Sequence, residues 1–406
     1  MSDIAIDILD QETVAQAPTR SAIALVTLAL AVGSFGIGTG EFVIMGLLPD
    51  VAKTFDVSTP EAGHVISAYA LGVVVGAPVI AMLAAKMARR TLLLLMMTIF
   101  TLGNVMSAMA PTFESFTALR FITGLPHGAF FGVAALVAAS MVPMNRRVRA
   151  VGQVMLGLTI ATLVGTPIAT LLGQLLDWRA AFMLVGAVGA LTVVLIAMFL
   201  PKDKVSEGAG IMRELGALKR IQVWLTLAIA AVGFGGMFSI FTYIASTTTD
   251  VAGMSTAMIP VVLALFGIGM NVGNLVGSRL ADISLTGTIG GMLAFNVVIM
   301  TVFSLTATNP VMLCICVFLI GCGFAACPAV QTRLMDVAAD AQTLAAASNH
   351  SAFNVANALG AWLGGLAIAW GYTAGSTGYV GAVLSAGGLV VFAISMMLER
   401  RSRITI

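Results

Sequence analysis

Long apolar runs dominate the sequence, and short polar or proline-containing joints interrupt them at regular intervals. Each run has about 20 residues or slightly more, the length that an α-helix needs to cross the roughly 30 Å hydrocarbon core of a bilayer. Because lipid offers backbone groups no hydrogen-bond partner, such runs span as helices. The pattern predicts twelve membrane-spanning helices, at residues 22–46, 61–84, 92–110, 115–140, 148–175, 180–200, 221–247, 257–279, 287–307, 310–333, 343–370 and 375–397.

One connection is longer and more highly charged than the other joints, and it lies at the middle of the chain. The two halves on either side echo each other at an offset of about 197 residues, so that Gly124 aligns with Gly321 and Ala85 with Asp282. Parallel repeats of this kind occur in transporters that bind solute where the repeats meet. The predicted parts are a cytoplasmic tail at 1–20, a six-helix bundle at 21–200, a cytoplasmic linker at 201–220, a second six-helix bundle at 221–398 and a cytoplasmic tail at 399–406.

Composition and charge agree with a membrane protein that crosses the bilayer many times. Of the 406 residues, 59% are hydrophobic and only 9% are charged, far below the roughly 25% of a soluble domain. The net charge of +2 gives no indication of nucleic-acid binding. If the N-terminus is cytoplasmic, 17 of the 20 lysines and arginines fall on the cytoplasmic side. This bias predicts that both termini are cytoplasmic.

The sequence lacks the motifs of the common enzyme classes. It contains no Gly-x-x-x-x-Gly-Lys-Ser/Thr loop for ATP, no zincin motif and no Gly-x-Ser-x-Gly elbow. Its four cysteines fall in one apolar run without metal-ligand spacing. We therefore predict that the protein is not an enzyme and that it needs no cofactor or metal.

Glu41 is an ionisable side chain inside the first apolar run. A charged group there costs roughly 2.5–3.5 kcal/mol on insertion scales, so its presence suggests a function. We predict that this carboxyl faces a water-filled cavity and exchanges a proton. The alternative is a position at the membrane–water interface, because Pro49 and Asp50 follow within about three helical turns.

The run at 115–140 combines a polar face with a stripe of small residues. Arg120, Thr123 and His127 recur at i, i+3 and i+7 and so share a face. A guanidinium keeps its proton, so Arg120 needs a carboxylate, backbone carbonyls or water as partners. His127 either titrates or packs with a hydrogen bond to the backbone. A packing stripe is predicted at every fourth residue, at Gly124, Gly128 and Gly132.

Further polar side chains recur at helical spacing in other runs and could line a cavity for solute. Hydrogen bonding between helices, without contact to solute, is the alternative for each. The substrate-cavity candidates are Thr123, Thr162, Thr166, Asn271, Asn274, His350 and Asn354.

The run Arg120-Phe-Ile-Thr-Gly-Leu-Pro-His-Gly-Ala-Phe-Phe-Gly132 resembles the fourth-helix signature of the drug:proton antiporter branch of the major facilitator superfamily. Together with Gly40-Glu41-Phe42 and the turn at 177–182, it is most similar to the arabinose-efflux-permease group of sugar and drug exporters. The resemblance covers roughly residues 22–398. It implies two six-helix bundles around a central cavity, with the first and fourth helices lining it. Because Glu41 and Arg120 then share a depth, we expect them to face one another across the cavity.

Two motifs depart from the family pattern. The loop after the second helix usually reads Gly-x-x-x-Asp-Arg-x-Gly-Arg-Arg, whereas here alanines at 81, 85 and 88 replace both glycines and the acid. The fifth helix usually carries Gly-x-x-x-Gly-Pro, and here Ala161 precedes Gly165-Thr166-Pro167 with one inserted residue. The gating and hinge candidates are Lys86, Arg89, Arg90, Gly165, Pro167 and Asp282.

The residues and the resemblance together predict a secondary active transporter of the bacterial inner membrane. We expect proton-coupled efflux of a small neutral or amphiphilic solute, a drug or a sugar, by alternating access, from a monomer in the bilayer. The proton-coupling candidates are Glu41, Arg120 and His127. Two alternatives are an uncoupled facilitated-diffusion carrier and a non-transporting membrane sensor on the same fold.

Overall fold

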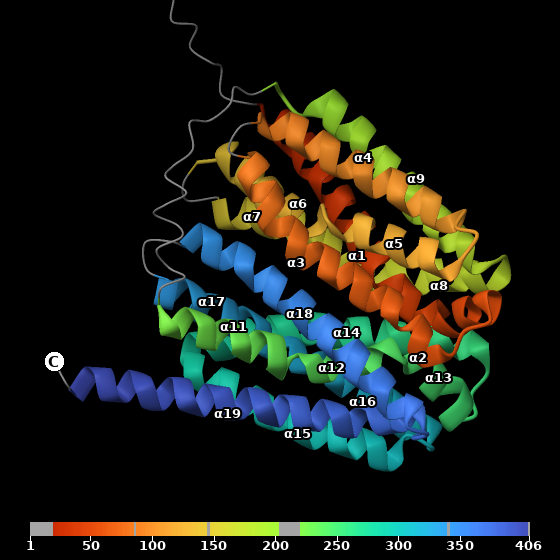
Figure 1. The fold of residues 1–406 in the computed structure, drawn as a ribbon. Helices are drawn as coiled ribbons and strands as arrows, with labels where there is room; N and C mark the ends of the chain where they lie inside the picture. Colours follow the sequence, from red (N-terminus) through yellow and green to blue (C-terminus); the bar gives the residue numbers. More distant parts are fainter. Residues whose placement is uncertain (1–18, 85–86, 144–146, 203–219, 339–341, 405–406) are drawn as a thin grey trace, which may run out of the picture.

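The computed structural model describes residues 19–84, 87–143, 147–202, 220–338 and 342–404, and its secondary structure there is helical throughout (Figure 1). In the first half, up to residue 202, the helices are α1 (Arg20–Phe55), α2 (Thr59–Ala62), α3 (His64–Ala84), α4 (Arg89–Ala108), α5 (Phe113–Gly124), α6 (His127–Ser140), α7 (Arg147–Ile160), α8 (Thr166–Leu175) and α9 (Trp178–Phe199). In the second half, from residue 220, they are α11 (Ile221–Gly233), α12 (Gly235–Thr242), α13 (Ile244–Ser246), α14 (Ile259–Ile283), α15 (Leu285–Thr306), α16 (Pro310–Cys322), α17 (Ala326–Ala338), α18 (Gln342–Ala369) and α19 (Thr377–Ile404).

Helices occupy every apolar run that the sequence singles out. Within the described residues, eleven of these helical segments are long and apolar enough to cross a membrane. Helix α3, which fills the predicted run 61–84 with 21 residues, lies outside that set. The all-helical fold class is confirmed.

Several helices differ from the predicted runs in length or continuity. Helix α1 is longer than the predicted 22–46, because Thr19 caps its start and the chain leaves the helix only at Asp56, where φ is +53°. The run at 115–140 is broken between α5 and α6 at Leu125-Pro126, since proline cannot donate the next helical hydrogen bond. The run at 148–175 contains a π-helical turn at Ala161–Gly165. The family motif with its one inserted residue includes this turn, which is wider than a turn of α-helix because it holds one residue more.

Figure 1 shows the helices of the first half above those of the second half, with α3 beside α18 between them. Helix α1 packs against α7 and α9, and α4 against α9. In the second half, α14 packs against α16 and α15 against α19. Helix α1 begins and α19 ends on the left of this view, which we call the terminal end; α2 and α13 lie at the opposite, far end.

The two halves touch at the far end. The Ser67 hydroxyl of α3 donates a 3.3 Å hydrogen bond to the Ala358 carbonyl of α18. Gln174, near the end of α8, donates from Nε2 to the Thr256 carbonyl over 3.2 Å. The part of α1 that runs to this end, residues 42–48, is buried throughout. The described conformation is therefore closed at the far end.

Candidate functional site

Glu41 lies near the middle of α1, and only 6% of the residue is exposed. Its Oε2 atom lies 4.0 Å from Nδ1 of His127 in α6. Its Oε1 atom accepts a 3.4 Å hydrogen bond from Nδ2 of Asn357 in α18. One carboxyl group therefore contacts both halves of the chain. Because the residue is buried well inside a 36-residue helix, the interface position considered from the sequence does not fit the structure.

Tyr69 of α3 connects His127 with Arg120, and the sequence alone did not single it out. Its hydroxyl and Nδ1 of His127 are hydrogen-bonded at 2.9 Å, with the donor set by the histidine tautomer. The centre of its ring lies 4.3 Å from the guanidinium carbon of Arg120, a cation–π contact. Gly124 permits this approach of α3 to α5, because a Cβ there would overlap the Tyr69 carbonyl.

Arg120 is fully buried, and in the described part of the chain none of its three guanidinium nitrogens has a hydrogen-bond partner. The sequence predicts that Arg120 and Glu41 face one another across the cavity. The structure places them in one cluster, but no ion pair within 4 Å joins them among the described residues. The Tyr69 ring lies against the guanidinium instead, so the two charged groups are linked through Tyr69 and His127.

A cavity of about 120 Å³ lies beside Glu41, between helices of the two halves. Helix α18 starts at the terminal end, so its lining residues 349–354 lie on that side of Asn357 (Figure 1). Apolar side chains, among them Phe42 and Phe238, complete the wall. The lining contains seven residues that the sequence singles out: Glu41, His127, Thr162, Asn271, Asn274, His350 and Asn354.

Several polar side chains of the cavity donate hydrogen bonds to backbone carbonyls of their own helices, which leaves some of their acceptor atoms without partners in the described part of the chain. Asn271 and Asn354 donate from Nδ2 to the carbonyls of Gly267 (2.7 Å) and His350 (3.0 Å). Oδ1 of Asn354 and Oδ1 of Asn349 are buried without a partner among the described residues. The His350 ring stacks on Phe131 of the first half at 5.5 Å between ring centres. The wall thus combines aromatic faces with uncharged acceptors.

Two predicted cavity residues lie elsewhere, which corrects the set. Thr123 is fully buried and donates its hydroxyl to the Arg120 carbonyl over 2.8 Å, so its side chain serves its own helix. Thr166 is 1% exposed and lies beyond the π-helical turn. Neither lines the cavity in this conformation.

The gating and hinge candidates are spread over several places. Lys86, and Ala85 with it, lies outside the described residues. Arg90 donates from Nη2 to the Ala197 carbonyl over 2.6 Å, which ties α4 to α9, and Arg89 begins α4. Asp282 is exposed near the end of α14.

The predicted hinge at Gly165-Thr166-Pro167 coincides with the π-helical turn and the start of α8. A Cβ at Gly165 would overlap the Thr39 hydroxyl of α1. Glycine therefore allows α1 and this turn to approach each other closely.

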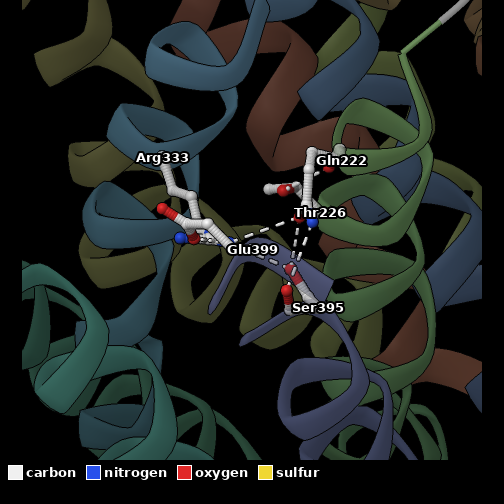
Figure 2. Close-up of polar contacts among 5 residues, drawn as sticks. All are labelled: Gln222, Thr226, Arg333, Ser395 and Glu399. Atoms are coloured by element: carbon white, nitrogen blue, oxygen red, sulfur yellow. Dashed lines mark hydrogen bonds and ion pairs between the residues drawn. The ribbon is translucent and has the colours of Figure 1, made fainter. Parts of the chain in front are cut away.

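A second buried arginine, which the sequence alone did not single out, lies in the second half (Figure 2). Nη2 of Arg333 in α17 donates to Ser395 Oγ at 2.9 Å and to Glu399 Oε2 at 3.2 Å, both in α19. Oε1 of Gln222 in α11 accepts from Ser395 at 2.7 Å and lies 3.5 Å from the same guanidinium nitrogen. This arginine cluster joins three helices of the second half.

Membrane-crossing helices that enclose a polar cavity between two halves are typical of a secondary transporter. The sequence profile of the Major Facilitator Superfamily matches residues 30–360, and the chain belongs to this superfamily. The family membership predicted from the sequence is thus confirmed.

Relatives agree along most of the chain. The inner membrane transport protein YdhP of Escherichia coli (strain K12) is 41% identical over 375 residues, which cover 92% of this chain and 96% of that protein. The chloramphenicol resistance protein of Streptomyces lividans is 32% identical over 381 residues, covering 93% and 96% respectively. The crystal structure of a mutant of the nucleoside transporter NupG shares the fold with a TM-score of 0.72 at 14% identity, over 91% of this chain and 99% of that one.

These findings bear out the class predicted from the sequence. The protein is a transporter of the superfamily and not an enzyme. It is a multi-pass protein of the bacterial inner membrane.

Proposed function

We propose that the protein exports a small neutral or amphiphilic solute, a drug or a sugar, in exchange for protons, by alternating access. The observation that carries this proposal is the Glu41 carboxyl, which is buried between the two halves and lines the cavity. Intramembrane acids at such positions are typical proton sites of transporters. Arg120 and His127 complete the proton-coupling site, with Tyr69 holding both.

Coupling requires that the proton has different affinities for the two conformations, because a ligand shifts an equilibrium only through that difference. Closing and opening the cavity changes the solvation of Glu41 and its distance from Arg120, and both act on a carboxyl's proton affinity. The solute and the proton then stabilise opposite conformations, so binding of one disfavours binding of the other. Exchange follows without a direct contact between them.

The character of the cavity supports an uncharged solute. Apart from Glu41 and the two histidines, its polar groups are hydroxyls, carboxamides and one thiol, and phenylalanine rings supply flat apolar surface. A neutral molecule with an aromatic or apolar face and hydrogen-bond donors matches such a wall. The similarity to a chloramphenicol resistance protein supports a drug of that kind.

We further propose twelve spans in two bundles, at 21–200 and 221–398, joined by a cytoplasmic linker at 201–220 in a monomer. Helix α3 is the twelfth span, because it has 21 residues and packs against α5 and α18. Both termini are cytoplasmic. Reporters fused after residues 145 and 210 should report the cytoplasm, and one fused after residue 56 the exterior. Opposite compartments would overturn this topology.

Reconstitution tests the coupling. Purified protein in liposomes that contain a pH-sensitive dye should release or take up protons when chloramphenicol or arabinose is added across a gradient. Glu41→Gln should abolish this proton movement while solute binding, measured by equilibrium dialysis, stays within about twofold. Glu61→Gln, which alters an exposed acid of α2, is the matched control.

Three outcomes separate the alternatives. Wild-type proton exchange in Glu41→Gln would move the proton site to another group, with His127 first. Solute flux without proton movement in the wild-type protein would identify an uncoupled carrier. Binding of either compound without any flux would favour a membrane sensor.

A further inference from the structure

We propose that Asn357 is the residue through which the second half detects the proton on Glu41, and that it thereby couples protonation to movement of the two halves. The inference rests on the proposed function. Asn357 is 1% exposed, and its Nδ2 atom donates to Glu41 Oε1 over 3.4 Å. In the described part of the chain, its Oδ1 atom is buried and has no partner.

The backbone of Asn357 is fixed firmly in the second half. Gly360 follows one turn later, and a Cβ there would overlap the Gly235 carbonyl of α12. Such close approach makes α18 and α12 move as one body. The carbonyl of Ala358, the residue after Asn357, accepts the hydrogen bond from the Ser67 hydroxyl of α3 at the closed far end. A change at the Asn357 side chain therefore acts directly on the contact between the halves.

A carboxamide can respond to both protonation states of a carboxyl. An ionised Glu41 only accepts, so it bonds to the Nδ2 hydrogens of Asn357. A protonated Glu41 donates through its O–H, and the buried Oδ1 atom can accept that bond after a half-turn of the amide. Hydrogen bonds to an ionised group are roughly twice as strong as neutral ones. The ionised carboxyl thus holds the far end closed more firmly than the protonated one does.

Other titratable and charged groups lie near Glu41, either in the first half or along the cavity. Tyr69, His127 and Arg120 lie near Glu41 on α3, α6 and α5, and the hydrogen bond, ion pair and cation–π contact that link them lie within the first half. His350 lies on α18 itself, where its ring stacks on Phe131 and interacts electrostatically with His127. Among the described side chains, Asn357 is the group of the second half that is hydrogen-bonded to Glu41.

The experiment follows conformation without any solute. Spin labels at Lys53 and Tyr372, exposed residues at the far end of the first and second halves, report the opening of that end as a distance distribution. The four native cysteines are replaced first. Double electron–electron resonance is then measured in liposomes at pH 5.5 and pH 8.5. The variants are Asn357→Leu, Asn357→Asp, Glu41→Gln and, as a control on the outer face of α18, Val355→Leu.

We expect the distribution to shift with pH in the wild-type protein and in Val355→Leu, and to be the same at both values in Asn357→Leu and Glu41→Gln. Asn357→Asp keeps the size of the side chain but loses its constant donor, so it should show more of the open far end at pH 8.5 than the wild-type protein. A wild-type shift in both Asn357 variants, with none in Glu41→Gln, would overturn this inference alone. A wild-type shift in Glu41→Gln, or no shift in the wild-type protein, would overturn the proton site itself.

Discussion

Among the residues whose burial the structure describes, each half of the chain has one buried arginine, and the polar partners of the two arginines differ. Arg333 is 4% exposed and donates to a serine and a glutamate within 3.2 Å, with a glutamine beside them (Figure 2). Arg120 is fully buried over the Tyr69 ring, and its guanidinium nitrogens lack hydrogen-bond partners among the described residues. Burying a charged group without a partner costs free energy, whereas hydrogen bonds and an ion pair offset much of that cost.

The difference indicates different tasks. Nη2 of Arg333 already has a carboxylate and a hydroxyl as partners, although Nε has none among the described residues. Because a change of conformation would break these bonds, Arg333 is expected to keep α11, α17 and α19 together throughout the transport cycle. An arginine with unused donors is stabilised by any state that brings it a carboxylate or water. Arg120 is therefore expected to change partners as the halves move, and Glu41 is the acid in its cluster.

The largest expected effect comes from exchanging each arginine for lysine, which keeps the charge but loses the planar guanidinium. Arg120→Lys should lower proton-coupled flux by about 10- to 100-fold, as expected for losing a charged contact worth roughly 1.5–3 kcal/mol. Arg333→Lys should leave flux within about threefold and lower the melting temperature instead. Flux in liposomes and thermal unfolding of the same preparations measure both. Equal loss of flux in the two variants would remove the distinction.

The next prediction concerns the glycines that bring α3 against α5. Gly124→Ala should displace Tyr69 from Arg120, because the new Cβ would overlap the Tyr69 carbonyl. Flux and melting temperature should both fall. Gly132→Ala is the matched control, since a Cβ there meets nothing within 4 Å and alanine is favoured over glycine in a helix by about 1 kcal/mol. A harmless Gly124→Ala would show that the helices can separate without cost.

A smaller effect should separate the two contacts of Tyr69. Tyr69→Phe removes the 2.9 Å hydrogen bond to His127 but keeps a ring beneath Arg120, and should reduce flux by about two- to tenfold, the effect of one neutral hydrogen bond. Tyr69→Leu removes both contacts and should approach the loss seen in Arg120→Lys. If the two Tyr69 variants behave alike, the ring contact has no part in holding Arg120.

The smallest expected effect lies outside both arginine clusters. Asp282 is the acid that remains at the second-half position of the loop motif, whereas the first half has Ala85 there. Asp282→Asn should shift the balance between the two conformations about twofold, in line with the modest value of exposed charges. Ala85→Asp should shift it less. Labelling of Cys327, which lines the cavity, reports that balance, and unchanged labelling in Asp282→Asn would refute the role.

The sequence predicts well what depends on nearest neighbours along the chain. Apolar runs of bilayer length place the helices, and the isolated acid and basic residue mark Glu41 and Arg120 as unusual. Tyr69 could not be found this way, because a tyrosine in an apolar run has no distinctive spacing and its importance comes from a contact with His127, 58 positions away. The contact of Glu41 with Asn357 spans 316 positions and depends on how the two halves pack.

Thr123 and Thr166, two predicted cavity residues, do not line the cavity because local structure interrupts the regular helical spacing. Helical spacing places Thr123 on one face with Arg120 and His127. The helix is interrupted at Pro126, however, and the Thr123 hydroxyl donates to the Arg120 carbonyl of its own helix. Spacing also groups Thr162 with Thr166. The π-helical turn separates them, and a uniform period of 3.6 residues cannot represent that turn.

That turn makes the wall of the cavity sensitive to chain length. Its wider loop holds one residue more than a uniform helix would, and one residue corresponds to a rotation of about 100°. Thr162 lines the cavity, while Thr170, two turns later, faces Gly46 of α1. Deleting a single residue, such as Val164, would restore an ordinary helix and turn its two parts relative to each other. A change of chain length in this segment is therefore expected to alter the wall of the cavity more than the exchange of one side chain would.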